Sequence, residues 1–158
     1  MKSLILTVIA TLALATTPAF GHGGVEIGPN GGRILELSKN ASVHAEVTLK
    51  DGKFHVAILD KDMKPVAVKD QSLTATGGTR QKPEKLAVEK TAEGFVIPAV
   101  QPGQWLIVQF KENDKAKAVT ARLEYNTETC DACDSPEWVC KCEMNKKKKE
   151  AASGAKKE

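Results

Sequence analysis

Short extended segments, separated by turn residues, recur along most of this 158-residue chain. Gly, Pro, Asn and Asp cluster between them, which is the pattern of β-strands joined by tight turns. No stretch of about eleven residues carries an apolar stripe at helical spacing. The segments are 33–37, 42–49, 53–59, 72–76, 85–90, 94–100, 104–110 and 118–125. The sequence therefore predicts an all-β fold, an antiparallel, immunoglobulin-like (Ig-like) β-sandwich of about seven or eight strands.

The segment from 42 to 60 predicts the best-defined hairpin. Asp51-Gly52 is a favoured two-residue turn, and it sets a register that places only apolar pairs on the core face. These pairs are Leu49 with Phe54, Val47 with Val56, and Ala45 with Ile58. A shift by one residue would place Val and Leu opposite Lys and His, so burial selects the first register.

The opposite face of this hairpin carries two histidines, His44 and His55, with Glu46 between their levels. The two histidines are separated by roughly 14 Å along the strand, too far to hold one ion together. Glu46 could join either histidine as a metal ligand, but a solvated polar strand face is the favoured interpretation. The sequence thus keeps His44, Glu46 and His55 as candidate ligands and expects their side chains to face solvent.

The N-terminus has the form of a secretory signal peptide. Lys2 precedes an uncharged run, and small residues with Pro18 follow before a glycine-rich segment. The run is short for a membrane span, although a retained anchor helix is the alternative. We expect residues 1–21 to be removed by cleavage near Ala19 or Gly21. The mature protein should then be periplasmic or secreted and carry no transmembrane segment.

Composition divides the rest of the chain into three parts. These are one β-sandwich domain at 22–129, a Cys-rich appendix at 130–143 and a disordered Lys-rich tail at 144–158. The formal net charge of +3 comes from the tail, because the body of the chain is nearly neutral. Such a lysine run is more often a solvated tail than a nucleic-acid arm, so we expect no nucleic-acid partner.

His22 lies at the predicted cleavage site. Cleavage after Gly21 makes its imidazole and the new α-amine a chelating pair, and cleavage after Ala19 offers four nitrogens in a plane. Square-planar nitrogen sites suit Cu(II) and Ni(II). The alternative is that one histidine happens to lie near the cut, because so short a motif is easily matched.

All four cysteines fall within thirteen positions, in the pattern C-x2-C-x6-C-x-C. The first pair has the separation of a metal knuckle, whereas the second is closer than usual, so this is not a standard zinc ribbon. Four thiolates in so short a loop could still surround a tetrahedral Zn(II) or hold Cu(I). Trp138, between the pairs, is expected to dock the appendix onto the sandwich. The candidate ligands are Cys130, Cys133, Cys140 and Cys142.

Disulfides are the alternative state of these cysteines. Exported cysteines are normally oxidised, and four of them allow three pairings. A bridge between Cys140 and Cys142 would close a tight ring, so crossed or nested bridges between the two pairs are favoured. Acidic neighbours should raise the thiol pKa values unless a cation is bound, which argues against a reactive redox dithiol. These neighbours are Asp131, Asp134, Glu137 and Glu143.

Three stretches carry a family resemblance: "HGGVEIGPNGGRILEL", "VHAEVTLKDGKFHVAILDKDMKPV" and "VTARLEY". From about His22 to Tyr125 the chain resembles small exported bacterial β-sandwich domains, found alone or fused to periplasmic adaptor subunits of heavy-metal efflux pumps. The resemblance implies an accessory role near metal handling, with an envelope efflux or metal-trafficking protein as partner. The matched positions include His22, Gly23, Gly24 and His44. The Cys-rich appendix and the lysine tail are not part of the family pattern.

Catalytic motifs are missing from the sequence: there is no nucleophile elbow, metal-binding helix or phosphate loop. We therefore expect no enzyme, but an exported accessory protein that binds or buffers a transition metal, copper or zinc. Its predicted cofactor is a Cu or Zn ion. The alternative is a disulfide-stapled module for protein–protein interaction or structure in the cell envelope.

Overall fold

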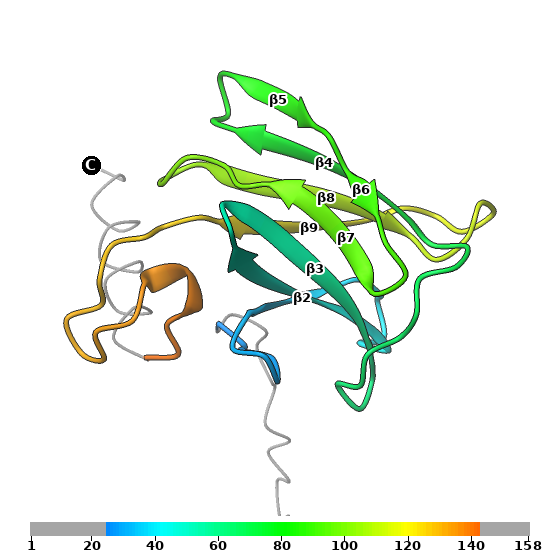
Figure 1. Cartoon of the computed structure of the whole chain (residues 1–158), viewed down its shortest axis with the longest axis horizontal. Helices are drawn as coiled ribbons and strands as arrows, with labels where there is room; N and C mark the ends of the chain where they lie inside the picture. Colours follow the sequence, from blue (N-terminus) through cyan, green and yellow to red (C-terminus); the bar gives the residue numbers. More distant parts are fainter. Residues whose placement is uncertain (1–24, 143–158) are drawn as a thin grey trace, which may run out of the picture.

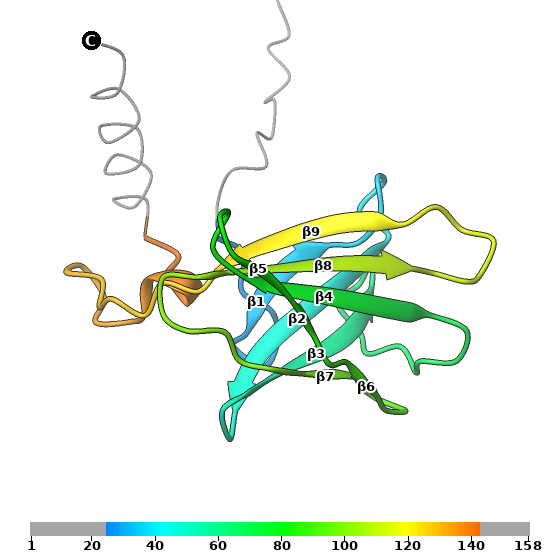
Figure 2. The same ribbon diagram turned by 90° about the horizontal axis from the view of Figure 1, so that it is seen from above.

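The computed structural model describes residues 25–142, which form two antiparallel sheets that face each other as layers (Figure 1, Figure 2). The strands are β1 Arg33–Glu36, β2 Val43–Lys50, β3 Lys53–Asp60, β4 Ser72–Gly78, β5 Pro83–Leu86, β6 Glu89–Lys90, β7 Gly94–Pro98, β8 Trp105–Lys111 and β9 Val119–Glu124. One sheet has the order β1-β2-β3-β7-β6 and the other β5-β4-β8-β9. The predicted all-β sandwich is confirmed.

Several predicted features lie outside the described residues: the signal peptide, His22 and the lysine-rich tail. Between residues 25 and 142 no helix is long and apolar enough to cross a membrane.

The described part of the chain has nine strands rather than seven or eight, because the segment predicted at 85–90 is divided. β5 pairs with β4 in the four-stranded sheet, whereas β6 pairs with β7 in the five-stranded sheet. Between them the chain passes from one layer to the other. Leu86 and Val88 are partly buried on either side of this crossing and pack against the core. One short stretch therefore contributes to both layers.

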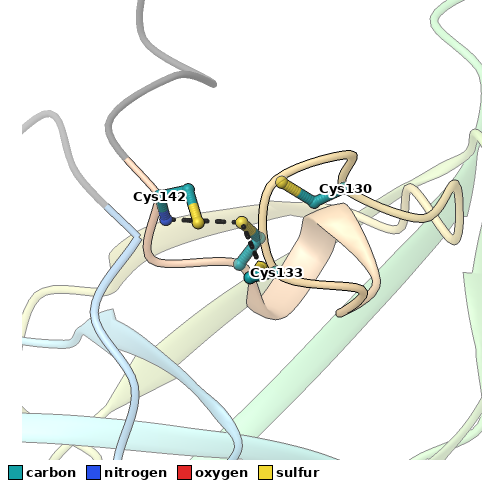
Figure 3. Close-up of side chains that lie close together, drawn as sticks. Cys130, Cys133 and Cys142 are labelled. Atoms are coloured by element: carbon teal, nitrogen blue, oxygen red, sulfur yellow. Dashed lines mark hydrogen bonds between the residues drawn. The ribbon is translucent and has the colours of Figure 1, made fainter.

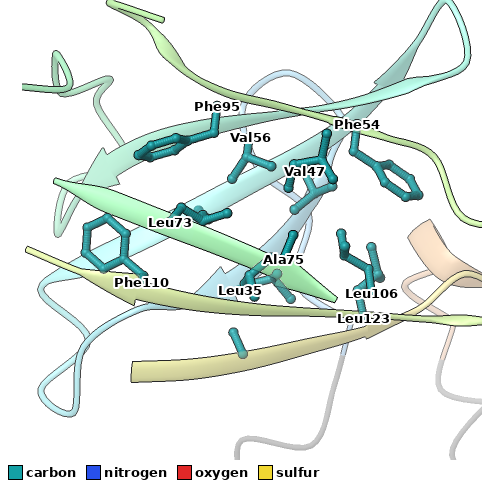
Figure 4. Close-up of a cluster of buried hydrophobic side chains, with 14 of the residues drawn as sticks. Leu35, Val47, Phe54, Val56, Leu73, Ala75, Phe95, Leu106, Phe110 and Leu123 are labelled. Carbon is teal, nitrogen blue, oxygen red and sulfur yellow. The ribbon is translucent and has the colours of Figure 1, made fainter. Parts of the chain in front are cut away.

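The hydrophobic core lies between the sheets, because inward and outward side chains alternate along each strand. In β8, for example, Leu106, Val108 and Phe110 are buried and Gln109 is exposed. The buried cluster runs the length of the sandwich, with Phe110 near one end and Phe54 near the other (Figure 4). Phe54 marks the end of the core that meets the C-terminal appendix.

The predicted hairpin is confirmed in its register. β2 and β3 pair Leu49 with Phe54, Val47 with Val56, and Ala45 with Ile58. The turn residues Asp51 and Gly52 have φ angles of 51° and 71°. Two-residue hairpin turns require such left-handed conformations, which Gly adopts without steric cost and Asp tolerates.

The prediction of a solvated outer face on this hairpin is wrong for Glu46 and His44, which are only 1% and 5% exposed. The turn at 28–32 folds across Glu46. Asn30 donates its backbone N–H to Glu46 Oε1 (2.7 Å) and its side-chain Nδ2 to Oε2 (2.8 Å), and the Gly32 N–H donates to Oε1 (3.0 Å). A Cβ on Gly28 would lie 2.6 Å from the Glu46 carboxyl carbon, so this close approach requires glycine.

Replacement of Glu46 by alanine should lower the free energy of unfolding by at least about 2 kcal/mol, because three N–H groups lose a carboxylate acceptor in a buried setting. Urea denaturation of both proteins measures the difference. Glu89→Ala is the matched control, since Glu89 is exposed on β6 and its replacement should change stability by less than about 0.5 kcal/mol. Equal effects of the two substitutions would contradict a role for Glu46 in holding the turn.

Candidate metal centre

The C-terminal appendix packs against one end of the sandwich. After β9 the chain forms a compact loop, described as far as Cys142, that includes a short 3-10 helix, η1 Glu137–Val139 (Figure 1, orange). Trp138 in this helix is 8% exposed and belongs to the core cluster. The prediction that Trp138 docks the appendix onto the sandwich is therefore confirmed.

Trp138 contacts two aromatic residues, Phe54 of β3 and Tyr125 just after β9. The ring centroids are 6.1 Å apart for Phe54 and Trp138, 5.5 Å for Tyr125 and Trp138, and 5.1 Å for Phe54 and Tyr125. All three pairs are edge-to-face, an arrangement that contributes about 0.5–1.5 kcal/mol per pair beyond the burial of area. The appendix is thus an extension of the core.

Hydrogen bonds fix the orientation of the docked loop. The backbone N–H of Trp138 donates to the Asn126 carbonyl oxygen (2.9 Å), and Arg33 Nη1 donates to the Trp138 carbonyl oxygen (3.2 Å). Asn126 Nδ2 also donates to Glu137 Oε2 (2.8 Å). Sequence reasoning missed Arg33 and Asn126 as supports of the loop. No local signal could have found Arg33, because it lies 105 residues before Trp138.

A tight turn brings the first two cysteines together. The backbone N–H groups of Cys133 and Asp134 both donate to the Cys130 carbonyl oxygen, at 3.3 and 3.0 Å, and the Cys130 N–H donates to the Ser135 carbonyl oxygen (2.9 Å). Asp134 adopts a left-handed conformation, with φ at 55°, which Asp tolerates better than most residues. The chain thereby reverses direction within the C-x2-C segment.

The second two cysteines follow η1 directly. The Cys140 N–H donates to the Glu137 carbonyl oxygen (3.2 Å), and Cys140 itself is extended, which ends the helix. The Cys142 N–H then donates to Cys140 Sγ (3.3 Å). An N–H donated to sulfur stabilises a thiolate at that position. The close C-x-C spacing therefore serves to fold the backbone of one cysteine onto the sulfur of the other.

The four sulfur atoms converge on one point. All four Sγ atoms lie within 4.8 Å of one another, and those of Cys133 and Cys140 are 3.4 Å apart. Figure 3 shows three of these cysteines, Cys130, Cys133 and Cys142, close together in the loop. Four sulfurs bound to a tetrahedral Zn(II) at about 2.3 Å would stand about 3.8 Å from one another. The cluster can therefore hold a metal ion with small movements of its side chains.

The cysteines are all free thiols in this structure. The disulfides that the alternative interpretation predicts are therefore not present. The sulfurs of Cys133 and Cys140 are 3.4 Å apart, well beyond the S–S bond length of about 2.05 Å. Cys130 and Cys140 are buried, Cys142 is half-buried and Cys133 is exposed. One side of the cluster thus faces the core and the other faces solvent.

The expectation that acidic neighbours raise every thiol pKa is wrong for Cys133. A backbone hydrogen bond from Ser135, followed by hydrogen bonds from the Cys140 and Cys142 side chains, lowers the pKa of Cys133 to about 6. Hydrogen bonds to Cys133 and Cys140 raise the pKa of Cys142 to about 12. The backbone N–H of Cys142 acts to lower the pKa of Cys140, but burial and hydrogen bonds to Cys130 and Cys133 together raise it. The cluster therefore concentrates negative charge on one exposed sulfur.

This distribution predicts a pH-dependent reactivity. In reduced, metal-free protein the alkylation rate of Cys133 by iodoacetamide should rise with a midpoint near pH 6, since the thiolate is the nucleophile and forms above that pH. Cys142 should remain unreactive through pH 9, because its pKa is raised to about 12. Peptide mapping by mass spectrometry after timed alkylation measures both sites in one sample. A common midpoint near the ordinary cysteine value of about 8.5 would contradict the prediction.

The other predicted ligands are not gathered into a cluster of this kind; within residues 25–142 the cysteines alone form a group of three or more metal-binding side chains. His44 Nδ1 lies 3.3 Å from the Asp60 carbonyl oxygen, and both carboxylate oxygens of Glu46 receive hydrogen bonds from the turn above them. His55 is half-buried within the sheet between β2 and β7. His22 lies outside the described residues.

The chain was compared with protein-family models, with curated proteins and with solved structures. None of the three comparisons gives a match.

Proposed function

We propose that this chain is a non-catalytic metal-binding protein that holds one transition-metal ion in the cluster of Cys130, Cys133, Cys140 and Cys142. The observation that carries the proposal is the convergence of the four Sγ atoms within 4.8 Å of one another. Two independent disulfides would need only paired sulfurs. A common centre is the arrangement that four thiolates adopt around a single cation.

Zn(II) is the ion that the donor set favours. Four sulfur ligands in a tetrahedron are typical of zinc, and no other described His, Asp or Glu joins the group. Cu(I) is the other soft ion that thiolates bind well. Binding must displace the protons of Cys140 and Cys142, whose pKa values are raised, so the affinity should increase with pH.

The exposure of the cluster favours metal handling over a purely structural role. Cys133 is exposed and Cys142 half-buried, so an incoming ligand can reach the ion from that side while Cys130 and Cys140 keep it attached. The signal-peptide pattern and the resemblance to efflux-pump accessory domains support a place in the cell envelope. An envelope efflux or metal-trafficking protein is the partner that fits this role, and His22 at the new terminus would provide a second, nitrogen-based site.

A second candidate is a disulfide-stapled envelope module that acts through protein–protein contacts. The observation that favours it is the 3.4 Å contact between the sulfurs of Cys133 and Cys140, which come from different halves of the loop. This candidate requires an oxidised cluster without metal and a loss of stability on reduction.

Native mass spectrometry of the exported protein, with and without thiol alkylation, distinguishes the two candidates. We expect a single metal adduct that disappears when the thiols are alkylated first. A mass that is two or four hydrogens light, in a chain that takes up no metal after reduction, would favour the stapled module instead. Failure of the reduced protein to take up either Zn(II) or Cu(I) when each is supplied would refute the metal-binding function.

A further inference from the structure

The sulfur atoms of Cys133 and Cys140 are in direct contact, at 3.4 Å, although the tight turn and η1 separate the two residues along the chain. A disulfide requires about 2.05 Å between sulfurs, so each atom would need to move by less than about 1 Å. A displacement of this size is within the range of side-chain rotation. The pair is therefore placed for a covalent bond as well as for a shared ion.

The two members of the pair differ in exposure. Cys133 is exposed, whereas Cys140 is 1% exposed. A soluble disulfide can reach the first sulfur but not the second. This is the division between an attacking thiol and a resolving thiol that thiol–disulfide exchange requires, because the mixed disulfide is released only when a second thiol is within reach.

We propose that Cys133 and Cys140 form a reversible dithiol–disulfide couple whose oxidation by a disulfide substrate expels the metal ion from the cluster. The expulsion rests on the metal-binding function proposed above, whereas the exchange reaction of the pair does not. Oxidation removes two of the four ligands at once. The two cysteines that remain, Cys130 and Cys142, cannot complete a tetrahedral sulfur site.

The reaction balances as two exchange steps. The Cys133 thiolate attacks one sulfur of the substrate R–S–S–R, the substrate bond breaks, and the first RS⁻ leaves and takes up a proton. Cys140 Sγ then attacks Cys133 Sγ in the mixed disulfide, and the second RS⁻ leaves with the proton that Cys140 gives up. The protein pair loses two electrons and the substrate gains two. When metal is bound, both sulfurs react as thiolates and the ion departs with its charge unchanged.

Other pairings are less favourable in this loop. A bridge from Cys140 to Cys142 would span a single residue, which strains the ring. Cys130 is buried like Cys140, so it is not the first thiol that an external disulfide meets. The first bond we expect is the one between Cys133 and Cys140, because it joins the exposed thiol to the buried thiol whose sulfur it contacts at 3.4 Å.

Disulfide mapping on the reduced, metal-free chain tests the couple directly. The protein is treated with oxidised glutathione, quenched in acid, alkylated and mapped by mass spectrometry. We expect a loss of two hydrogens, with Cys133 joined to Cys140. Cys130→Ser and Cys142→Ser should keep this product, and Cys133→Ser should lose it. A first bond between any other pair of cysteines would overturn the proposal. Mapping of the unsubstituted chain is enough to detect such a bond, so the test does not depend on the folding of the variants.

Zinc release tests the second half. The reduced chain is loaded with zinc alone and then oxidised with glutathione disulfide in the presence of a chromophoric chelator. One zinc ion should be released per disulfide formed and should bind again after reduction. Retention of zinc by the oxidised chain would overturn the expulsion step. A chain that takes up neither Zn(II) nor Cu(I) before the oxidant is added would refute the metal function and the expulsion with it, while the mapped bond still decides the couple.

Discussion

Replacement of Cys140 by serine should abolish stable metal binding. Cys140 is the most buried of the four cysteines; its sulfur contacts Cys133 Sγ and accepts the N–H of Cys142. Serine keeps the size of the side chain but replaces a soft thiolate with a hydroxyl that a soft ion binds weakly. Changes to groups that only support a ligand already cost about 10–100-fold in affinity, so loss of the ligand itself should exceed about 100-fold.

Competition with a chromophoric zinc chelator under reducing conditions measures this affinity. Lys141→Ala is the matched control, because Lys141 lies between two of the cysteines, is exposed and has no ligand atom that thiolate-binding ions prefer. Its affinity should remain within about threefold of the unsubstituted chain, a difference of less than about 0.7 kcal/mol. Should Cys140→Ser bind zinc as tightly as Lys141→Ala, the four-sulfur site would be wrong.

Replacement of Phe54 by alanine should lower both the stability of the fold and the affinity for metal. Phe54 is fully buried and contacts the rings of Tyr125 and Trp138. Deletion of such a side chain costs about 3–5 kcal/mol of unfolding free energy. It also removes the partner against which Trp138 docks, and Trp138 lies two residues before Cys140. The ligands should then be less well positioned before the ion binds.

Phe110→Ala provides the control, since Phe110 is equally a core residue but lies toward the other end of the buried cluster (Figure 4). Urea denaturation of the metal-free proteins should show losses of similar size for the two variants. Zinc titration without urea and at low temperature, where both variants remain folded, should distinguish them. Phe54→Ala should bind zinc more weakly than the unsubstituted chain, and Phe110→Ala should bind it equally well. Identical zinc affinities would mean that the cluster is independent of its aromatic support.

The core of the sandwich thus also supports the loop that carries the candidate metal site. Trp138 links the two, because its ring packs into the core while its backbone is held by Asn126 and Arg33. If zinc binds the folded chain and not the unfolded one, it should raise the free energy of unfolding. The increase is about 4 kcal/mol when the free zinc concentration is about a thousand times the dissociation constant. The loop would therefore transmit the occupancy of the site to the stability of the whole domain.

Much of the fold follows from short-range information. Alternation of apolar and polar residues predicted the strands, and the Asp51-Gly52 turn fixed the register of the hairpin to the residue. Alternation could not show what covers each face. Glu46 is polar and faces away from the core as expected, yet the turn at 28–32 buries it. The sequence predicts one strand at 85–90, because a pattern of single residues does not show where a chain changes layer; the structure has β5 and β6 in different sheets.

For the candidate metal site, too, some features follow from the sequence and others only from the tertiary structure. The sequence by itself determined which residues carry sulfur, that they lie in one short loop, and that Trp138 would attach this loop to the core. Only the tertiary structure decided that all four sulfurs share one centre, that Cys133 alone is exposed, and that Arg33 holds the loop from the far end of the sequence. The reason is physical: turn chemistry and side-chain periodicity act between near neighbours, whereas convergence and burial depend on how distant segments pack around a common core.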